Sequence, residues 1–255
     1  MNTIGFIGVG ELALYTIKGM RRGGYKGEIL LSPRNAEKAA HLRQDYDCAV
    51  QADNQAVVSN SDFVFIATRP AQCLETLAEL EFKPGQVLIS VVAGIEVEAL
   101  RQAVPAELAV VRAMPVSSAE VGASPTLVYP AHEFVGTLFD YCGTAIPVDD
   151  EKHFDQGTIL ACVYSWYFTL FQALIDATTG PRLPGGVSAD LVLGMAKGAA
   201  ELALASADKP GEIAEGVATE GTFSKLGLDL LKNEKAFEPW RDACKLLEKR
   251  LAESD

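Results

Sequence analysis

A glycine-rich turn directly after the first apolar run of the chain is the feature that most constrains its fold. Residues 3–7 are apolar and suit a strand, and Gly8, Gly10 and Ala13 follow with the spacing G-x-G-x-x-A before a stretch of helical periodicity. In a strand–turn–helix unit the first glycine permits the tight turn, the second lets the backbone approach a pyrophosphate, and the alanine allows close packing of helix on strand. The turn therefore predicts a dinucleotide site at the start of the first helix, lined by Gly8, Gly10, Glu11 and Leu12.

Short apolar runs alternate with helical patterns over the first 150 residues. The expected strands are residues 3–7, 28–31, 62–67, 87–91, 109–112 and 144–148, and the expected helices are residues 12–22, 36–44, 71–80, 97–103 and 132–141. Continuous apolar strands are typical of sheets that helices cover on both faces. We expect an α/β fold in which residues 1–150 form a Rossmann-type, doubly wound parallel sheet that binds a dinucleotide.

Residues 151–255 lack strand patterns and predict an all-helical dimerisation and substrate domain. Long helices are expected at residues 153–178 and 188–207, a further element after residue 211, and a last helix at 239–252. The first long helix is apolar on more than one face, so we expect a second copy to cover it in a homodimer. Its most apolar run, residues 159–171, is shorter than the roughly 20 residues of a membrane span.

The composition favours a small-molecule substrate. The 255 residues include 22 Lys and Arg against 34 Asp and Glu, a formal net charge of −12, without a basic run. Nucleic acid and anionic membranes are therefore not the expected partners. The five cysteines show neither metal-ligand spacing nor a disulfide framework, so we expect no metal. The N-terminus has no basic segment or cleavage site of a signal peptide, and a cytoplasmic protein is expected.

The end of the second expected strand distinguishes NADPH from NADH. Residues 31–35 read Leu-Ser-Pro-Arg-Asn, without the acid that usually contacts the ribose hydroxyls of NAD. Arg34 is suited to a 2′-phosphate, and Ser32 and Asn35 are suited to donate to it. The alternative for Ser32 and Asn35 is capping of the next helix, which is compatible with NADPH binding. Glu11 has the same ambiguity, since it lies near the phosphates or caps its helix.

Further motifs recur along the chain in a fixed order. They are residues 5–10 (GFIGVG), Asn54, residues 65–70 (FIATRP), residues 89–95 (ISVVAGI) and residues 112–115 (RAMP). This succession resembles pyrroline-5-carboxylate reductase, an NAD(P)H-dependent oxidoreductase acting on CH–NH groups in proline synthesis. The resemblance covers essentially the whole chain, and it implies that Asn54, Ala67, Thr68, Arg69, Pro70, Ala93 and Gly94 also bind the cofactor. From the residues alone, Asn54 has the alternative of capping a helix at residue 55.

The C-terminal half departs from this family at the expected active centre. The family's T-G-L-S-G-S-G-P-A-Y stretch corresponds to residues 158–167, where Ala161 and Val163 replace its two serines and Cys162 and Tyr164 replace two glycines. Thr219 corresponds to the serine that binds the substrate carboxylate, and Ser224 to the threonine that contacts the imine nitrogen. Glu220 replaces a proline.

We expect from these residues an NADPH-dependent reductase of a C=N bond, with Ser224 and Thr219 at the substrate. The substrate is pyrroline-5-carboxylate or a related imine or 2-oxo acid. The rival interpretation is an NADPH-binding homologue with little catalysis, and the bulky residues near 163 have the alternative of serving only the core or the dimer interface. A β-hydroxyacid dehydrogenase is disfavoured because residues 154–176 contain no lysine.

Overall fold

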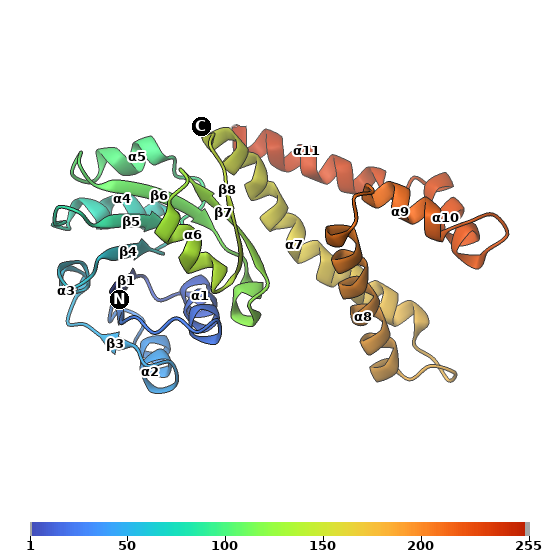
Figure 1. Ribbon diagram of the computed structural model, residues 1–255, viewed down its shortest axis with the longest axis horizontal. Helices are drawn as coiled ribbons and strands as arrows, with labels where there is room; N and C mark the ends of the chain where they lie inside the picture. Colours follow the sequence, from blue (N-terminus) through green and yellow to red (C-terminus); the bar gives the residue numbers. More distant parts are fainter. Residues whose placement is uncertain (1, 253–255) are drawn as a thin grey trace. The chain divides into compact units, whose positions relative to one another are not determined.

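The computed structural model describes residues 2–252, which form two compact units, residues 2–161 and 162–252 (Figure 1). The long helix α7, Glu151–Thr178, begins in the first unit and continues into the second.

The first unit contains an eight-stranded sheet with the order β3-β2-β1-β4-β5-β6-β7-β8. Its strands are β1 Ile4–Ile7, β2 Ile29–Leu31, β3 Ala49–Val50, β4 Phe63–Ile66, β5 Val87–Ser90, β6 Ala109–Met114, β7 Ser124–Tyr129 and β8 Gly143–Pro147. All neighbours pair in parallel except β6 and β7. These two are antiparallel because the segment between them holds only the 3-10 turn η1, Ser117–Val121, and no crossover helix.

Helices lie on both faces of this sheet. They are α1 Glu11–Arg22, α2 Ala36–Asp45, α3 Asn54–Ser59, α4 Pro70–Ala78, α5 Val97–Gln102 and α6 Glu133–Asp140. Successive strand residues point to opposite faces, so Phe6 joins a core cluster with α1, α2 and α6, whereas Ile7 joins a second cluster with α3, α4 and α5. The expected doubly wound Rossmann-type fold is confirmed, and its strands β1 to β6 end at the edge where the glycine turn lies.

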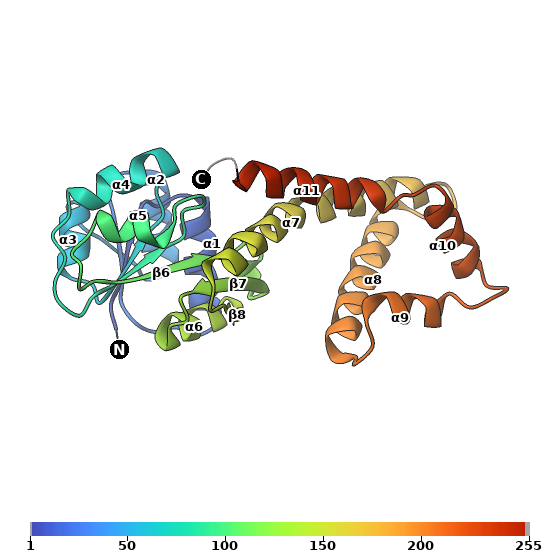
Figure 2. The ribbon, with the colours of Figure 1, turned by 90° about the horizontal axis from the view of Figure 1, so that it is seen from above.

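The second unit is entirely helical (Figure 2). After α7 come α8 Gly185–Ala205, α9 Pro210–Val217, α10 Phe223–Asn233 and α11 Glu238–Ala252. α7 and α11 pack through Trp166 and Trp240, whose ring centroids are 5.9 Å apart. Many apolar side chains on these helices remain exposed, among them Leu170, Leu174, Val187, Leu191, Leu193, Met195, Leu202, Leu204, Phe223, Leu226 and Leu230.

Helix α7 is longer than its apolar run indicated. It has 28 residues, because the polar residues that flank the run continue the same helix. By length and composition alone, α7 is apolar enough to cross a membrane, and it is the one such helix among residues 2–252. The expectation that this segment is too short for a span was therefore wrong.

Candidate active site

The turn between β1 and α1 forms a site for an anion. Gly8 has φ +91°, and a Cβ there would lie 2.6 Å from the carbonyl oxygen of Ala67, so this position requires glycine. Gly10 caps α1 without a side-chain hydrogen bond, and a Cβ on Gly10 would meet nothing within 4 Å. The first intrahelical bond runs from the Leu14 N–H to the Gly10 carbonyl, which leaves the amides of Glu11 and Leu12 without intrahelical acceptors. Open space in front of free N–H groups fits the pyrophosphate of a dinucleotide.

The carboxylate of Glu11 lies at this anion site and forms an ion pair with Lys38. Glu11 is the first residue of α1 and makes no capping bond. Its Oε1 lies 2.5 Å from the Nζ of Lys38 on α2. This exposed ion pair offsets part of the negative charge that Glu11 places beside the anion site.

Two polar residues after β2 hold the glycine turn in place. Ser32 is buried, and its Oγ accepts the N–H of Gly8 at 3.0 Å. Asn35 caps α2 by accepting the N–H of Lys38 at 3.4 Å and donates its Nδ2 to the Val9 carbonyl at 3.0 Å. Asn35 therefore has the capping role considered above and also links α2 to the turn.

Arg34 lies between them and is exposed. No ion pair or hydrogen bond of its guanidinium is found within residues 2–252. Arg34 is thus a cation available to a ligand beside β2.

The loop after β4 lies next to the glycine turn. Ala67 contacts Gly8 closely, Thr68 follows it, Arg69 caps α4, and Pro70 occupies the first turn of that helix. Asn54 is the first residue of α3, but Asp53 caps that helix by accepting the N–H of Ala56 at 2.7 Å. The capping alternative for Asn54 was therefore wrong, and its amide remains available to a ligand.

Thiol chemistry is not favoured in this unit. Burial raises the pKa of Cys73 to about 11, against a smaller opposing effect of Thr68, and burial raises the pKa of Cys142 to about 12. Burial also raises the pKa of Cys48 to about 11. These cysteines are neutral thiols at physiological pH and poor nucleophiles.

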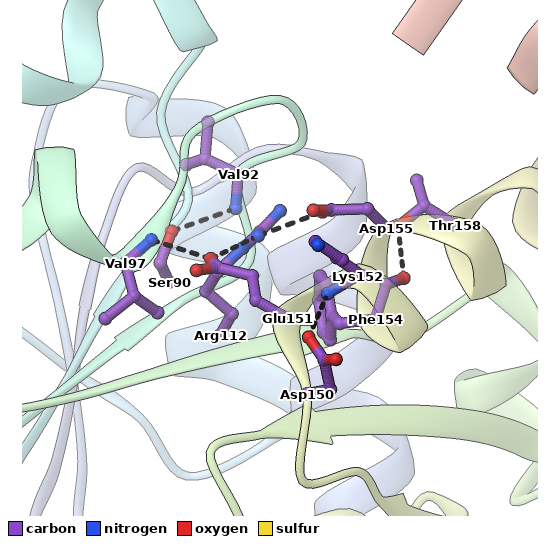
Figure 3. Close-up of polar contacts among 10 residues, drawn as sticks. All are labelled: Ser90, Val92, Val97, Arg112, Asp150, Glu151, Lys152, Phe154, Asp155 and Thr158. Carbon is purple, nitrogen blue, oxygen red and sulfur yellow. Dashed lines mark hydrogen bonds and ion pairs between the residues drawn. The ribbon is translucent and has the colours of Figure 1, made fainter. Parts of the chain in front are cut away.

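The loop after β5 carries Ala93 and Gly94, which are exposed, with Gly94 at φ +71°. This loop ends at Val97, whose N–H donates to Oε1 of Glu151 at 2.8 Å (Figure 3). The same Oε1 lies 2.5 Å from Nη1 of Arg112, and Oδ1 of Asp155 lies 3.0 Å from that nitrogen. Neither Glu151 nor Asp155 was predicted to be a functional residue. Acids placed i and i+4 at the start of a helix were the available signal, but nothing in the sequence linked them to Arg112.

Thr219 and Ser224 flank one turn in the second unit, between α9 and α10. The carbonyl of Thr219 accepts the Thr222 hydroxyl at 2.7 Å, and Thr222 in turn caps α10. Gly221 has φ +81°, so the turn requires glycine there. Both predicted hydroxyls are exposed, as is Glu220 between them. The turn therefore presents two hydroxyls and a carboxylate on its surface.

The replaced residues of α7 do not share one environment. Val163 is 7% exposed, whereas Cys162 is exposed, and Ala161 and Tyr164 are half-buried. The alternative that these residues serve only the core therefore fits Val163 but not Cys162.

A doubly wound sheet with an anion-binding glycine turn at its carboxyl edge is typical of the Rossmann-type, dinucleotide-dependent oxidoreductases. Comparison with known proteins agrees. A family model described as "NADP oxidoreductase coenzyme F420-dependent" matches residues 3–94, and one described as "Pyrroline-5-carboxylate reductase dimerisation" matches residues 151–253.

Individual relatives are more specific. The pyrroline-5-carboxylate reductase of Mycobacterium tuberculosis is 30% identical over 220 residues, covering 80% of this chain and 74% of the relative. Solved structures of the reductases from Streptococcus pyogenes and from Plasmodium falciparum, the latter with NADP bound, match with TM-scores of 0.84 and 0.85. They are 23% and 20% identical, and each comparison covers 99% of this chain and 98% of the other. The chain belongs to the pyrroline-5-carboxylate reductase family, which confirms the resemblance stated above.

Proposed function

We propose that this chain reduces the C=N bond of a small cyclic imine with NADPH. The observation that carries the proposal is the glycine turn, with open space at Gly10 facing the free amides of α1, in a chain of this reductase family. NADPH, when bound, supplies the hydride that adds to the imine carbon, and the nitrogen takes up a proton.

The chain's own residues bind and orient the two reactants. The amides from Gly10 to Leu12 hold the pyrophosphate, and Arg34 binds the 2′-phosphate with Asn35 beside it. Ser32 is buried and its Oγ accepts the Gly8 N–H, so it supports the turn in place of the direct contact with the 2′-phosphate that was expected of it. These contacts fix the nucleotide at its adenosine half.

The remaining predicted residues lie at the ends of β4 and β5 or at the start of α3. Asn54 and the segment Ala67, Thr68, Arg69 and Pro70 line the path of the dinucleotide, and Ala93 and Gly94 border the nicotinamide. In the second unit, Ser224 orients the imine nitrogen and Thr219 binds the polar end of the substrate. Catalysis is then mainly positioning, which brings reacting atoms to about 3–3.5 Å.

The same proposal includes a cytoplasmic homodimer formed through residues 151–255. Support comes from the dimerisation model that matches this region and from the exposed apolar side chains of α7, α8 and α10. A second copy that covers these side chains also accounts for the apolar character of α7, without a membrane.

The test is steady-state oxidation of NADPH with a panel of cyclic imines and 2-oxo acids that includes pyrroline-5-carboxylate. Turnover of at least one cyclic imine, with none in an Arg34→Ala, Ser224→Ala double variant at the same NADPH concentration, is expected. Tight NADPH binding with no oxidation by any panel member would instead identify a nucleotide-binding homologue without catalysis.

A further inference from the structure

The loop that carries Ala93 and Gly94 is fixed at its far end by a side chain from a distant part of the chain. Helix α5 begins at Val97, and its N-cap residue Glu96 makes no side-chain capping bond. The N–H of Val97 instead donates to Oε1 of Glu151, the first residue of α7. With only six residues, α5 has little stability of its own, so this external acceptor sets where the loop ends and the helix starts.

Arg112 fixes the position of Glu151 in turn. The Arg112 side chain is 3% exposed, its guanidinium lies 4.4 Å from the ring centroid of Phe154, and its Nη1 contacts both Glu151 and Asp155 (Figure 3). Arg112 is in β6 and pairs in register with Ser90, the last residue of β5. A buried guanidinium in the sheet therefore anchors the carboxylate that caps α5.

We propose that Glu151 is a positioning residue for the nicotinamide, because it holds the loop of Ala93 and Gly94 through the Val97 amide. The proposal rests on the proposed function, which places the nicotinamide at that loop. Gly94 is three residues from Val97 and has a positive φ, and glycine, which lacks a Cβ, restricts the backbone less than other residues. Releasing the Val97 amide would let Ala93 and Gly94 move relative to the bound ring.

Val97→Pro removes the donor and leaves Glu151 paired with Arg112. Proline is well tolerated at the first residue of a helix, and Glu96, with φ −69° and ψ 156°, already has the backbone conformation preferred before proline. Glu151→Ala removes the acceptor, and Glu151→Gln restores an acceptor oxygen without the charge. Asp155→Asn is the matched control, since Asp155 shares the contact with Arg112 but makes no bond to Val97.

The first readout compares dissociation constants for NADPH and for 2′,5′-ADP, which lacks the nicotinamide. We expect Val97→Pro and Glu151→Ala each to weaken NADPH binding about tenfold, since the released loop must then be ordered when the nicotinamide binds, and to leave 2′,5′-ADP unchanged. Glu151→Gln and Asp155→Asn should stay within about threefold of the wild type for both ligands. Equal weakening of both ligands, or no weakening by Val97→Pro, would overturn the proposal.

The second readout is amide hydrogen exchange across residues 91–97, which does not depend on turnover or on bound nucleotide. Faster exchange of these amides in Glu151→Ala, with protection restored in Glu151→Gln, is expected. If Glu151→Ala does not fold, the test is the comparison of Val97→Pro with the wild type. Exchange is then followed at residues 91–96, because proline at position 97 has no amide hydrogen. A wild type that binds no NADPH would defeat the proposed function, whereas unchanged exchange in this loop would defeat the role of Glu151.

Discussion

Arg34 is the residue on which the cofactor preference depends. Its guanidinium is exposed beside β2 without an ionic partner among the described residues, and residues 31–35 contain no acid. We predict that the wild type binds NADPH more tightly than NADH. Arg34→Ala should weaken NADPH binding by about ten- to a hundredfold, the effect of losing a hydrogen bond to a charged group, and should leave NADH binding unchanged.

Fluorescence titration with each nucleotide measures these dissociation constants. Arg43→Ala is the control, because Arg43 is exposed on α2 but lies more than two helical turns further along the chain. Equal or tighter NADH binding in the wild type, unaffected by Arg34→Ala, contradicts the prediction.

The ion pairs of Arg112 affect the stability of the fold. Its buried guanidinium depends on Glu151 and Asp155 for compensation. Replacing both acids with alanine should lower the free energy of unfolding by about 3–5 kcal/mol, because an unpaired charge then remains buried. Adding Arg112→Met to that double variant should recover most of the loss. Urea denaturation at a fixed protein concentration measures both effects, and no recovery in the triple variant would refute this explanation.

In the β1–α1 turn, one glycine is needed for folding and the other for binding the nucleotide. Gly8 has a positive φ and is close to Ala67, so Gly8→Ala should destabilise the fold itself. Gly10 has φ −91° and open space around its missing Cβ, so Gly10→Ala should change stability by less than about 0.5 kcal/mol. NADPH binding should nevertheless fall at least about tenfold, since the methyl group occupies the space of the pyrophosphate.

Thermal unfolding and NADPH titration of the two variants test this contrast. The contrast fails if Gly10→Ala binds NADPH as the wild type does, or if Gly8→Ala is as stable as the wild type.

The elements that sequence patterns predicted well are those with local causes. The glycine turn, the apolar strand β4 and the helix α1 follow from spacing and periodicity, and the structure confirms them. β3 was missed because two residues are too few to show a period. The contact between Glu151 and Val97 joins residues 54 positions apart, so it depends on the folded sheet and no local pattern reveals it.

At the scale of the whole molecule, the exposed apolar side chains of the second unit predict that two copies of the chain associate. Met195 and Leu204 on α8 are 68% and 89% exposed. Exposed apolar surface concentrated on a few helices is typical of an interface. We predict a dimeric mass by light scattering at micromolar concentration, and a shift toward monomer in a Met195→Glu, Leu204→Glu double variant.

Lys197→Glu and Glu201→Lys on the same helix are controls that change charge on exposed polar positions. A monomeric wild type at micromolar concentration would contradict the homodimer.

The substrate is the last property to predict, and it depends on several altered positions together. Ala161 and Val163 stand where the family has serines, and Glu220 stands exposed between Thr219 and Ser224, where the family has proline. A carboxylate beside the substrate-binding hydroxyls repels a substrate carboxylate and makes its desolvation more costly. We therefore predict that this chain reduces pyrroline-5-carboxylate poorly, below about 10⁴ M⁻¹s⁻¹ in kcat/KM, the lower end of ordinary enzyme efficiency.

Each lost charge-assisted hydrogen bond costs roughly 1.5–3 kcal/mol, so two such losses amount to several powers of ten in efficiency. A triple variant with Glu220→Pro, Ala161→Ser and Val163→Ser should raise kcat/KM on pyrroline-5-carboxylate, and Glu220→Gln alone should recover part of the gain by removing the charge. Since Val163 is buried, a serine at this position needs a hydrogen-bond partner and could destabilise the fold. The double variant Glu220→Pro, Ala161→Ser avoids this problem because it leaves Val163 unchanged. Steady-state NADPH oxidation measures kcat/KM for the wild type and for each variant. A wild-type efficiency above the stated limit would show that the repacked site still accepts a carboxylate, and Glu220 would then have to lie away from the bound substrate.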